Sequence, residues 1–347
     1  MKKKKFSCPS LLRYDLLTHH HRLIPMTTIR QVHPSPNVAK GVEYWEGVPA
    51  TVDGVLGGYG NGTLPRVDAL GSRTFLLRTL PYLSSIPPPA LNESPQMWTN
   101  ERIRQRGGKG KTVTRALDCG AGVGRVTEHV LLPLVDEVHM VEPVSKFLQE
   151  AKRRSASWKP LQLSVEQSPF CARKAVYFHT STLQEFLVAD PMSSQDTPNQ
   201  PSTPLLPSYM QGEVTEPPEK PVLYDIVLCQ WCLQHLSEAD LIRFLKDAKA
   251  TLRPPSPGGD ATSTCDGGVI FVKENVCRDA DDGGEASWYD SEDYSVTRSR
   301  TLYERIFREA GLSVVRSEVQ LGFPPELFDV QMCVTQNWVI DDRWALR

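Results

Sequence analysis

The chain has 347 residues, 40% of them hydrophobic, which is enough to bury one large core or two modest ones. Its 39 Lys and Arg nearly balance its 41 Asp and Glu, so a global basic field for nucleic acid or an anionic membrane is excluded. Eight irregularly spaced cysteines, and the lack of an apolar run of bilayer length, favour a soluble protein with reduced thiols. We expect a monomer in the cytoplasm and nucleus.

Low-complexity composition marks four segments that we expect to be disordered. Residues 1–35 form a basic extension, and three insertions rich in Pro, Ser or Thr follow near 84–95, 190–221 and 254–267. Such sequences carry too few apolar side chains to support a packed core. The sequence therefore predicts one domain, residues 36–347, interrupted by three loops.

The first part of this domain combines large aromatic rings with glycines. Tyr44, Trp45 and Tyr59 share one short segment with five glycines, which lie between Gly54 and Gly62. Such a composition is suited to a mobile flap that excludes water from a site beneath it. We therefore predict an aromatic flap over Tyr44 to Gly62.

A glycine loop gives the strongest local signal. A strand predicted at Val113–Leu117 leads into the run DCGAGVGR, residues 118–125, after which a helical pattern begins. Glycines let the backbone approach a ligand closely, and the helix start offers unpaired N–H groups. The spacing G-x-G-x-G differs from the dinucleotide fingerprint, which argues against a nicotinamide-dependent oxidoreductase. Asp118 at the strand end favours a positively charged cofactor portion, such as the amino acid end of S-adenosylmethionine, and Arg125 is suited to pair with its carboxylate.

The next strand supports a nucleotide cofactor. It is predicted at Glu137–Val141 and is followed by Glu142, about 20 residues beyond Gly122, where doubly wound folds bind ribose hydroxyls. Strand, loop, helix, strand and terminal acid thus form one consistent pattern.

The remaining pattern alternates strands with helices. Five further strands are predicted at Ala175–His179, Tyr224–Cys229, Val269–Lys273, Ser313–Ser317 and Val330–Thr335. One helix begins after Ser237 as N-cap and stops before Pro254, and another covers Arg298–Ala310 with Gly311 as its cap. The alternation predicts an α/β fold, doubly wound around a mostly parallel seven-stranded sheet.

Several runs resemble one enzyme family specifically. The sequence is similar to the protein N-terminal α-N-methyltransferases, which act on Xaa-Pro-Lys N-termini, over residues 38–347. The matching runs are YWEGVPATVDGVLGGYG, ALDCGAGVGRVT, LLPLVDEVHMVEP, TLQEF, YDIVLCQWCLQHL, LRP, VKEN and DSEDYSVTRS. The resemblance implies a Rossmann-like methyltransferase fold, S-adenosylmethionine as cofactor and protein N-termini as partners.

The resemblance also assigns site residues. It implies cofactor contacts at Gly120, Arg125, Glu142, Leu183, Gln184 and Gln230, to which we add Gly122 of the same loop. It implies peptide contacts at Tyr44, Trp45, Trp231, His235, Asn275, Asp290, Asp293 and Ser295. The family usually has Asp where Glu142 stands, and the region before Asp290 is longer and more acidic here.

Methyl transfer to an amine requires positioning and the removal of one proton. We predict that Asp293 holds the ammonium and accepts its proton, while His235 relays that proton outward. Trp231 is expected to stack on a substrate proline, Asn275 to fix the first carbonyl, and Asp290 to recognise the lysine.

Other interpretations remain open from the sequence alone. Trp45 and Trp231 are also compatible with core aromatics, His235 with a helix cap near Ser237, Asp290 and Asp293 with a solvated loop, and Asn275 with a turn. A small-molecule methyltransferase of the same fold is the main alternative function, and a non-enzymatic binding module is another. The pair Cys229 and Cys232 has C-x-x-C spacing, but no second pair lies at ribbon spacing, so we expect no metal.

Overall fold

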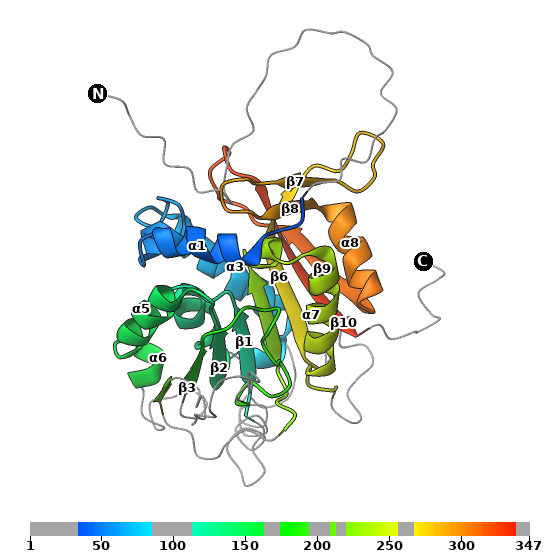
Figure 1. The fold of residues 1–347 in the computed structure, drawn as a ribbon. Helices are drawn as coiled ribbons and strands as arrows, with labels where there is room; N and C mark the ends of the chain where they lie inside the picture. The colour runs from blue at the N-terminus through cyan, green and yellow to red at the C-terminus, as the bar shows by residue number, and fades with distance from the viewer. Residues whose placement is uncertain are drawn as a thin grey trace, which may run out of the picture.

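The computed structural model describes residues 34–84, 113–162, 174–193, 209–212, 220–255 and 267–337. Most of the predicted N-terminal extension and of the insertions lies outside these residues. Ten strands form one sheet with helices on both sides (Figure 1). The strands are β1 (Arg115–Cys119), β2 (Glu137–Val141), β3 (Ala175–His179), β4 (Tyr209–Gly212), β5 (Ile226–Gln230), β6 (Val269–Cys277), β7 (Ser287–Tyr289), β8 (Val296–Ser299), β9 (Leu312–Val319) and β10 (Asp329–Asn337).

The sheet has the order β4-β3-β2-β1-β5-β6-β10-β9, and β8 pairs with β6 and β7. Its centre is parallel, whereas β10 runs antiparallel to both β6 and β9. All seven predicted strands are present, so the predicted fold class is confirmed. Three short strands were not predicted: β4, β7 and β8.

Strand β4 lies within residues 190–221, a segment for which we expect disorder. It forms an edge strand that pairs antiparallel with β3, from Tyr209 opposite Phe178 to Gly212 opposite Ala175. Four residues inside a proline-rich stretch are too few to stand out by periodicity, since a strand signal needs about four to eight alternating residues.

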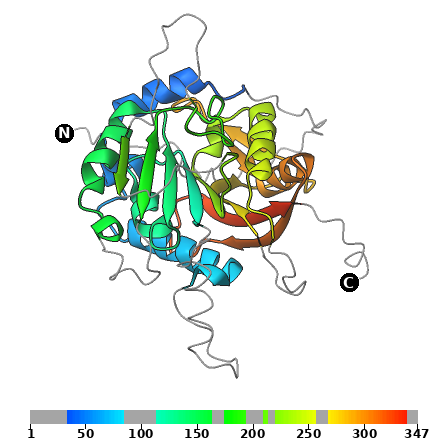
Figure 2. The same ribbon diagram turned by 90° about the horizontal axis from the view of Figure 1, so that it is seen from below.

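Helices cover the two faces of the sheet because neighbouring strand residues point in opposite directions. Ala116 belongs to a core that includes Phe75 and Leu76 of α3, whereas Leu117 belongs to a second core with Phe244 of α7. Figure 2 shows the sheet between these two layers. The helices are α1 (Val38–Gly47), α2 (Val52–Val55), α3 (Leu64–Thr79), α5 (Ser145–Ser155), α6 (Lys159–Gln162), α7 (Glu238–Ala250) and α8 (Arg300–Glu309), with short helices η2 (Pro81–Leu83), η3 (Thr127–Leu131) and η4 (Leu233–His235).

Capping side chains explain where the helices begin. Ser237 caps α7 as predicted, since its hydroxyl accepts a hydrogen bond from the Asp240 backbone N–H at 3.1 Å. Helix α8 starts two residues later than predicted, because Ser299 is its N-cap and Arg298 still belongs to β8. The segment predicted as a flap contains the end of α1 and all of α2, joined and followed by turns; Asn37 caps α1 and Thr51 caps α2.

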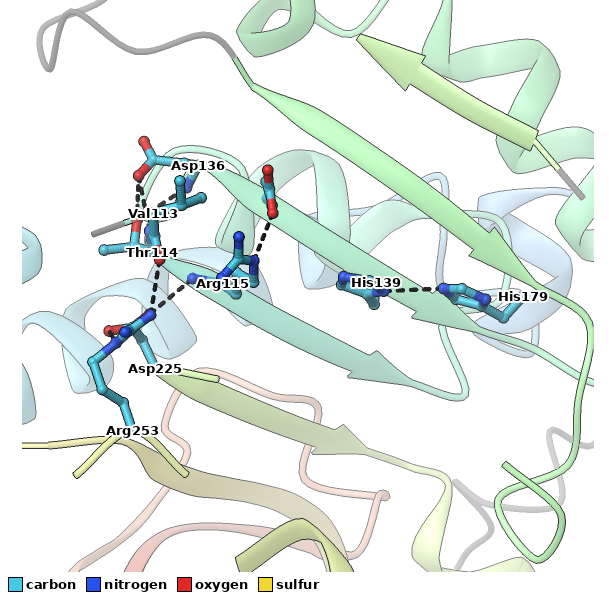
Figure 3. A network of polar contacts seen from close by, with 9 residues as sticks. Val113, Thr114, Arg115, Asp136, His139, His179, Asp225 and Arg253 are labelled. Atoms are coloured by element: carbon cyan, nitrogen blue, oxygen red, sulfur yellow. Dashed lines mark hydrogen bonds and ion pairs between the residues drawn. The ribbon is translucent and has the colours of Figure 1, made fainter. Parts of the chain in front are cut away.

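Ion pairs and hydrogen bonds lock the amino-terminal edge of the central strands (Figure 3). The Asp225 carboxylate accepts from the Arg115 backbone N–H at 2.8 Å and forms an ion pair with Arg253 at 2.9 Å. Further along β2, His139 and His179 are joined by a hydrogen bond of 3.1 Å. The opposite, carboxyl-terminal edge of the strands is the edge at which open α/β sheets bind ligands. Among the described residues, no helix has the length and apolarity needed to cross a bilayer.

Candidate active site

A cavity lies at the carboxyl ends of the central strands. Its wall is built from α1, the glycine loop, the turns after β2 and β3, and the segment after β5. The predicted residues that line it are Trp45, Gly120, Gly122, Arg125, Glu142, Leu183, Gln184, Gln230, Trp231 and His235. The structure therefore brings all seven predicted cofactor contacts into one cavity.

The glycine loop needs its glycines for two physical reasons. Gly120 and Gly122 have φ of 63° and 55°, the left-handed region that side chains disfavour. A Cβ on Gly120 would also lie 2.6 Å from the Cβ of Cys232. The backbone is thus exposed to the cavity where a ligand would lie.

Glu142 supports this loop as well as lining the cavity. Its carboxylate accepts hydrogen bonds from the backbone N–H of Gly122 and of Val144, both at 2.8 Å. Burial raises its pKa to about 7, although the two N–H donors oppose that shift. A carboxylate has about four acceptor positions, so Glu142 keeps capacity for ribose hydroxyls.

Asp118 has a different place from the one predicted. Strand β1 continues to Cys119, and the Asp118 carboxylate turns to the face of η3, where it accepts a hydrogen bond from the Thr127 hydroxyl at 2.5 Å. It does not line the cavity. Burial raises its pKa to about 7, and its place outside the cavity lining gives no support for a direct contact with a cofactor charge.

Arg125 and Gln230 line the cavity and share one partner, Asp68 of α3. Arg125 Nη1 lies 2.5 Å from Asp68 Oδ2, and Gln230 Nε2 donates to both Asp68 oxygens at 2.9 and 3.0 Å. On the opposite wall, Gln184 Nε2 donates to the His235 carbonyl at 3.4 Å, next to Leu183.

The segment after β5 is held in a strained shape. Trp231 has φ of 54°, unusual for a side chain of its size. The following backbone N–H groups of Cys232 and Leu233 donate to Glu274 Oε1 at 2.8 and 2.9 Å. Arg298 donates to the carbonyls of Leu233 and Leu236 from the other side. These anchors fix Trp231 and His235 against the cavity.

His235 is bound to the first helix rather than to an acid. Trp45 Nε1 donates to His235 Nε2 at 3.3 Å, and no hydrogen bond joins His235 to Asp293 in the described structure. Burial, together with Arg298, lowers the pKa of His235 to about 4. The predicted proton relay therefore lacks both the path and a suitable pKa.

The acidic turn between β7 and β8 holds the other predicted residues. Asp293 is fully buried, and its Oδ1 accepts from the Ser295 backbone N–H at 3.1 Å while Oδ2 has no hydrogen-bond partner. Burial, then the nearby Asp290 and Glu292, raise the pKa of Asp293 to about 6. Asp290 is also buried with one unpaired oxygen, and burial raises its pKa.

Asn275 completes this set. Both polar atoms of its amide are buried without a hydrogen-bond partner in the described structure. It lies on β6, immediately before the pairing of Val276 with Arg298 of β8, the strand that follows the acidic turn. Buried polar groups are almost always paired, so these unpaired atoms point to a ligand.

Helix α1 connects the cavity to the acidic turn. The Asn37 backbone N–H donates to the Tyr294 carbonyl at 3.3 Å, and the Lys40 ammonium lies 5.1 Å from the centre of the Tyr294 ring. On the other side, Val42 and Trp45 line the cavity. The ring of Tyr44 packs edge-on against that of Trp45, with 5.4 Å between the ring centroids. The helix therefore connects the predicted cofactor site with the predicted peptide site.

Sequence reasoning missed the buried charges that orient this site, Asp68, Lys273 and Glu274. Asp68 lies four residues from Leu64 and from Ser72 on the buried face of α3. Lys273 and Glu274 interrupt the apolar run of β6 and are almost fully buried. A charge on a core-facing position was the available signal, because such residues are rarely buried unless they are paired.

Comparison with known proteins decides the family. The family model described as AdoMet-dependent proline di-methyltransferase matches residues 34–186 and 208–336. The chain belongs to this family. S-adenosylmethionine is accordingly its cofactor.

Similar proteins come from distant organisms. An alpha N-terminal protein methyltransferase 1 of Schizosaccharomyces pombe is 32% identical over 86% of this chain and 95% of its own length. An N-terminal Xaa-Pro-Lys N-methyltransferase 1 of Xenopus tropicalis is 32% identical over 84% of this chain and 91% of its own. A solved structure of a SAM-dependent methyltransferase from Leishmania major is 29% identical, with a TM-score of 0.54, over 86% of this chain and 82% of its own.

The residues present fit this cofactor. The glycine loop exposes backbone to the cavity, Arg125 offers donors for a carboxylate, and Gln230 Oε1 is a buried acceptor without a partner in the described structure. These groups match the carboxylate and ammonium of the cofactor's amino acid end. Glu142 stands where ribose hydroxyls are bound in such folds.

Proposed function

We propose that this protein transfers methyl groups from S-adenosylmethionine to the free α-amine of proteins with Xaa-Pro-Lys N-termini. The names of the relatives in Xenopus tropicalis and Schizosaccharomyces pombe support this acceptor. The cofactor supplies an electrophilic methyl group, and the protein must hold an amine in line with it and remove one proton.

One observation carries the proposal: Asp293 is a fully buried carboxylate with an unpaired oxygen and a pKa of about 6. An α-amine has a pKa of about 7.7 to 8.0, so its ammonium form predominates at neutral pH. The ionised Asp293 attracts this ammonium and accepts its proton. The unpaired oxygen and the raised pKa support Asp293 as the general base.

The other predicted peptide residues take positioning roles. Trp231 and Trp45 line the cavity and offer aromatic surface to the substrate proline. Asn275, with its free amide, binds the first substrate carbonyl, while Asp290 provides the carboxylate for the lysine at position three. Ser295 holds Asp293 through its backbone N–H, and Tyr44 supports Trp45.

We assign His235 a role different from proton relay. Its Nε2 accepts the Trp45 N–H, so the imidazole holds α1 against the cavity. The low pKa keeps the ring neutral, which this hydrogen bond requires.

A small-molecule methyltransferase would need a different kind of substrate site beside the cofactor cavity. A metabolite pocket should be closed and mostly apolar. Asp290, Asp293 and Asn275 instead form a polar set outside the lining of the cofactor cavity. This set favours a charged peptide end over a metabolite.

The experiment is a transfer assay with labelled S-adenosylmethionine. A peptide beginning Ser-Pro-Lys is compared with the same peptide carrying an acetylated N-terminus, and with one in which the lysine is replaced by glutamate. We expect label in the free Ser-Pro-Lys peptide alone. Equal labelling of the acetylated peptide would move the acceptor to a side chain and overturn the proposal.

We also propose that the protein works as a monomer in the cytoplasm and nucleus. Five described cysteines, Cys119, Cys229, Cys232, Cys277 and Cys333, are free thiols, which supports a reducing compartment. Cell fractionation and sedimentation of the purified chain test the two parts separately.

A further inference from the structure

Four buried side chains from separate parts of the fold meet beneath the cofactor cavity. We call them the Asp68 cluster: Asp68, Arg125, Gln230 and Lys273. Besides its contacts to Arg125 and Gln230, the Asp68 carboxylate forms an ion pair with Lys273 Nζ at 2.6 Å. Asp68 and Lys273 have no exposed surface, and Arg125 and Gln230 are 5% and 6% exposed.

Within the cluster two cations face a single carboxylate. Arg125 and Lys273 outweigh the burial of Asp68 and lower its pKa to about 2, whereas burial lowers the pKa of Lys273 and the contact with Asp68 opposes that shift. Asp118 also interacts with Arg125, but burial raises the pKa of Asp118 to about 7, so it offsets the positive charge only in part. Lys273 is fully coordinated, since its ammonium also donates to the Asp68 carbonyl, the Ser72 hydroxyl and Gln320 Oε1 at 3.2, 3.0 and 2.9 Å. The spare positive charge therefore belongs to Arg125, whose guanidinium has five N–H donors.

Asp68 also decides which way the Gln230 amide points. The amide nitrogen donates to the carboxylate, which leaves Oε1 as a buried acceptor without a partner in the described part of the chain. The two residues that face the cavity thus present complementary groups. Arg125 offers spare donors, and Gln230 offers an acceptor, as an amino acid zwitterion requires.

We propose that Asp68, backed by Lys273, is a positioning residue that orients Arg125 and Gln230 to bind the amino acid end of S-adenosylmethionine. The competing role is structural: the cluster would merely join α3 to the sheet. The two roles differ in ligand dependence. A positioning role affects ligands with the amino acid group, whereas a structural role affects all ligands that use the cavity.

The test compares two ligands on the full chain by titration calorimetry. S-adenosylhomocysteine contains the amino acid group, and 5′-methylthioadenosine has the adenosine and sulfur but lacks it. Asp68→Asn should lower the affinity for S-adenosylhomocysteine by about tenfold or more, because the hydrogen bonds of Arg125 and Gln230 to its amino acid end lose their alignment. Affinity for 5′-methylthioadenosine should be unchanged. Equal loss of both ligands, or undiminished binding of S-adenosylhomocysteine, would overturn the proposal.

Two further variants guard against simple misfolding. The double variant Asp68→Asn with Lys273→Met removes both partners of the Asp68–Lys273 pair and keeps Arg125, so it should recover part of the thermal stability but not S-adenosylhomocysteine affinity. Recovery of that affinity would contradict the proposal. Asp225→Asn is the matched control, since it breaks the ion pair between the buried Asp225 and the partly buried Arg253 at the opposite edge of the sheet (Figure 3) and should leave both affinities unchanged. Calorimetry reads the cofactor site alone, so these outcomes do not depend on the identity of the methyl acceptor.

Discussion

In the proposed mechanism, burial prepares the Asp293 carboxylate to act as a base. The side chain is fully buried, so its charged form is destabilised and its pKa rises to about 6. An ordinary aspartate would be too weak a base for an ammonium, and a fully neutral one could not attract it. The neighbouring acids of the turn contribute to the same shift.

Replacement of this carboxylate should separate chemistry from cofactor binding. Asp293→Asn keeps the size of the side chain but removes the base, so we expect turnover to fall by about a hundredfold or more. Affinity for S-adenosylhomocysteine should not change, because Asp293 does not line the cofactor cavity. Steady-state kinetics on a Ser-Pro-Lys peptide and calorimetry measure the two effects. Unchanged turnover would remove Asp293 from the mechanism.

The pH profile should report the same group. Only ionised Asp293 accepts the proton, so kcat/KM should fall about tenfold per unit as the pH drops below about 6. Glu292→Gln removes an exposed like charge that raises the pKa of Asp293, so the acidic limb of the pH profile should shift to lower pH. A limb that stays fixed in this variant would indicate a different titrating group.

At the scale of elements, periodicity and capping predicted what depends on local sequence. The seven main strands, the Ser237 cap and the glycine loop follow from patterns within a few residues of one another. The Asp68 cluster does not, because its members come from positions 68, 125, 230 and 273, which only the tertiary fold brings together. The helices α1 and α2 in the segment predicted as a flap were not expected, because its five glycines mask the helical pattern, while its function as a flap stays a prediction.

The glycine loop offers a matched pair of substitutions. Gly120→Ala and Gly122→Ala share the penalty of a positive φ, about 1–2 kcal/mol. Only at Gly120 does the new Cβ clash, at 2.6 Å from Cys232, whereas at Gly122 the nearest atom is 3.8 Å away on Val55. Thermal unfolding should therefore show a larger loss for Gly120→Ala. Equal losses would mean that backbone strain alone accounts for the glycines.

Helix α1 is the element that should respond to both ligands. It contacts the cavity through Trp45 and the acidic turn through Asn37. We expect amide hydrogen exchange in α1 to slow when S-adenosylhomocysteine binds, and to slow further with peptide, while α8, none of whose residues lines the cavity, is unaffected. Exchange in α1 that ignores both ligands would exclude a flap function.

Over the whole molecule, the buried acids and the buried histidines change the free energy of unfolding in opposite directions as the pH falls. Burial raises the pKa of Asp118, Glu142 and Glu274 to about 7 and lowers that of His179 and His235 to about 4. On acidification the native state takes up protons at the acids, which favours folding, while the unfolded chain takes them up at the histidines. Ionisation of the buried acids at the carboxyl-terminal edge of the sheet therefore lowers the free energy of unfolding at neutral pH.

Glu274→Gln should show how much one buried acid lowers the free energy of unfolding. The pKa of Glu274 rises from 4.5 to about 7 on folding, so its contribution to stability is full below pH 4.5 and is lost as the pH rises through 7. Glutamine keeps the acceptor for the Cys232 and Leu233 N–H groups but does not titrate. Relative to the unmodified chain, the variant should gain up to about 3 kcal/mol in unfolding free energy between pH 4.5 and pH 8. Urea unfolding at both pH values measures the gain, with the exposed Glu43→Gln as control. No gain in Glu274→Gln would show that folding does not raise the pKa of Glu274, and an equal gain in the control would show that the effect does not come from burial of Glu274.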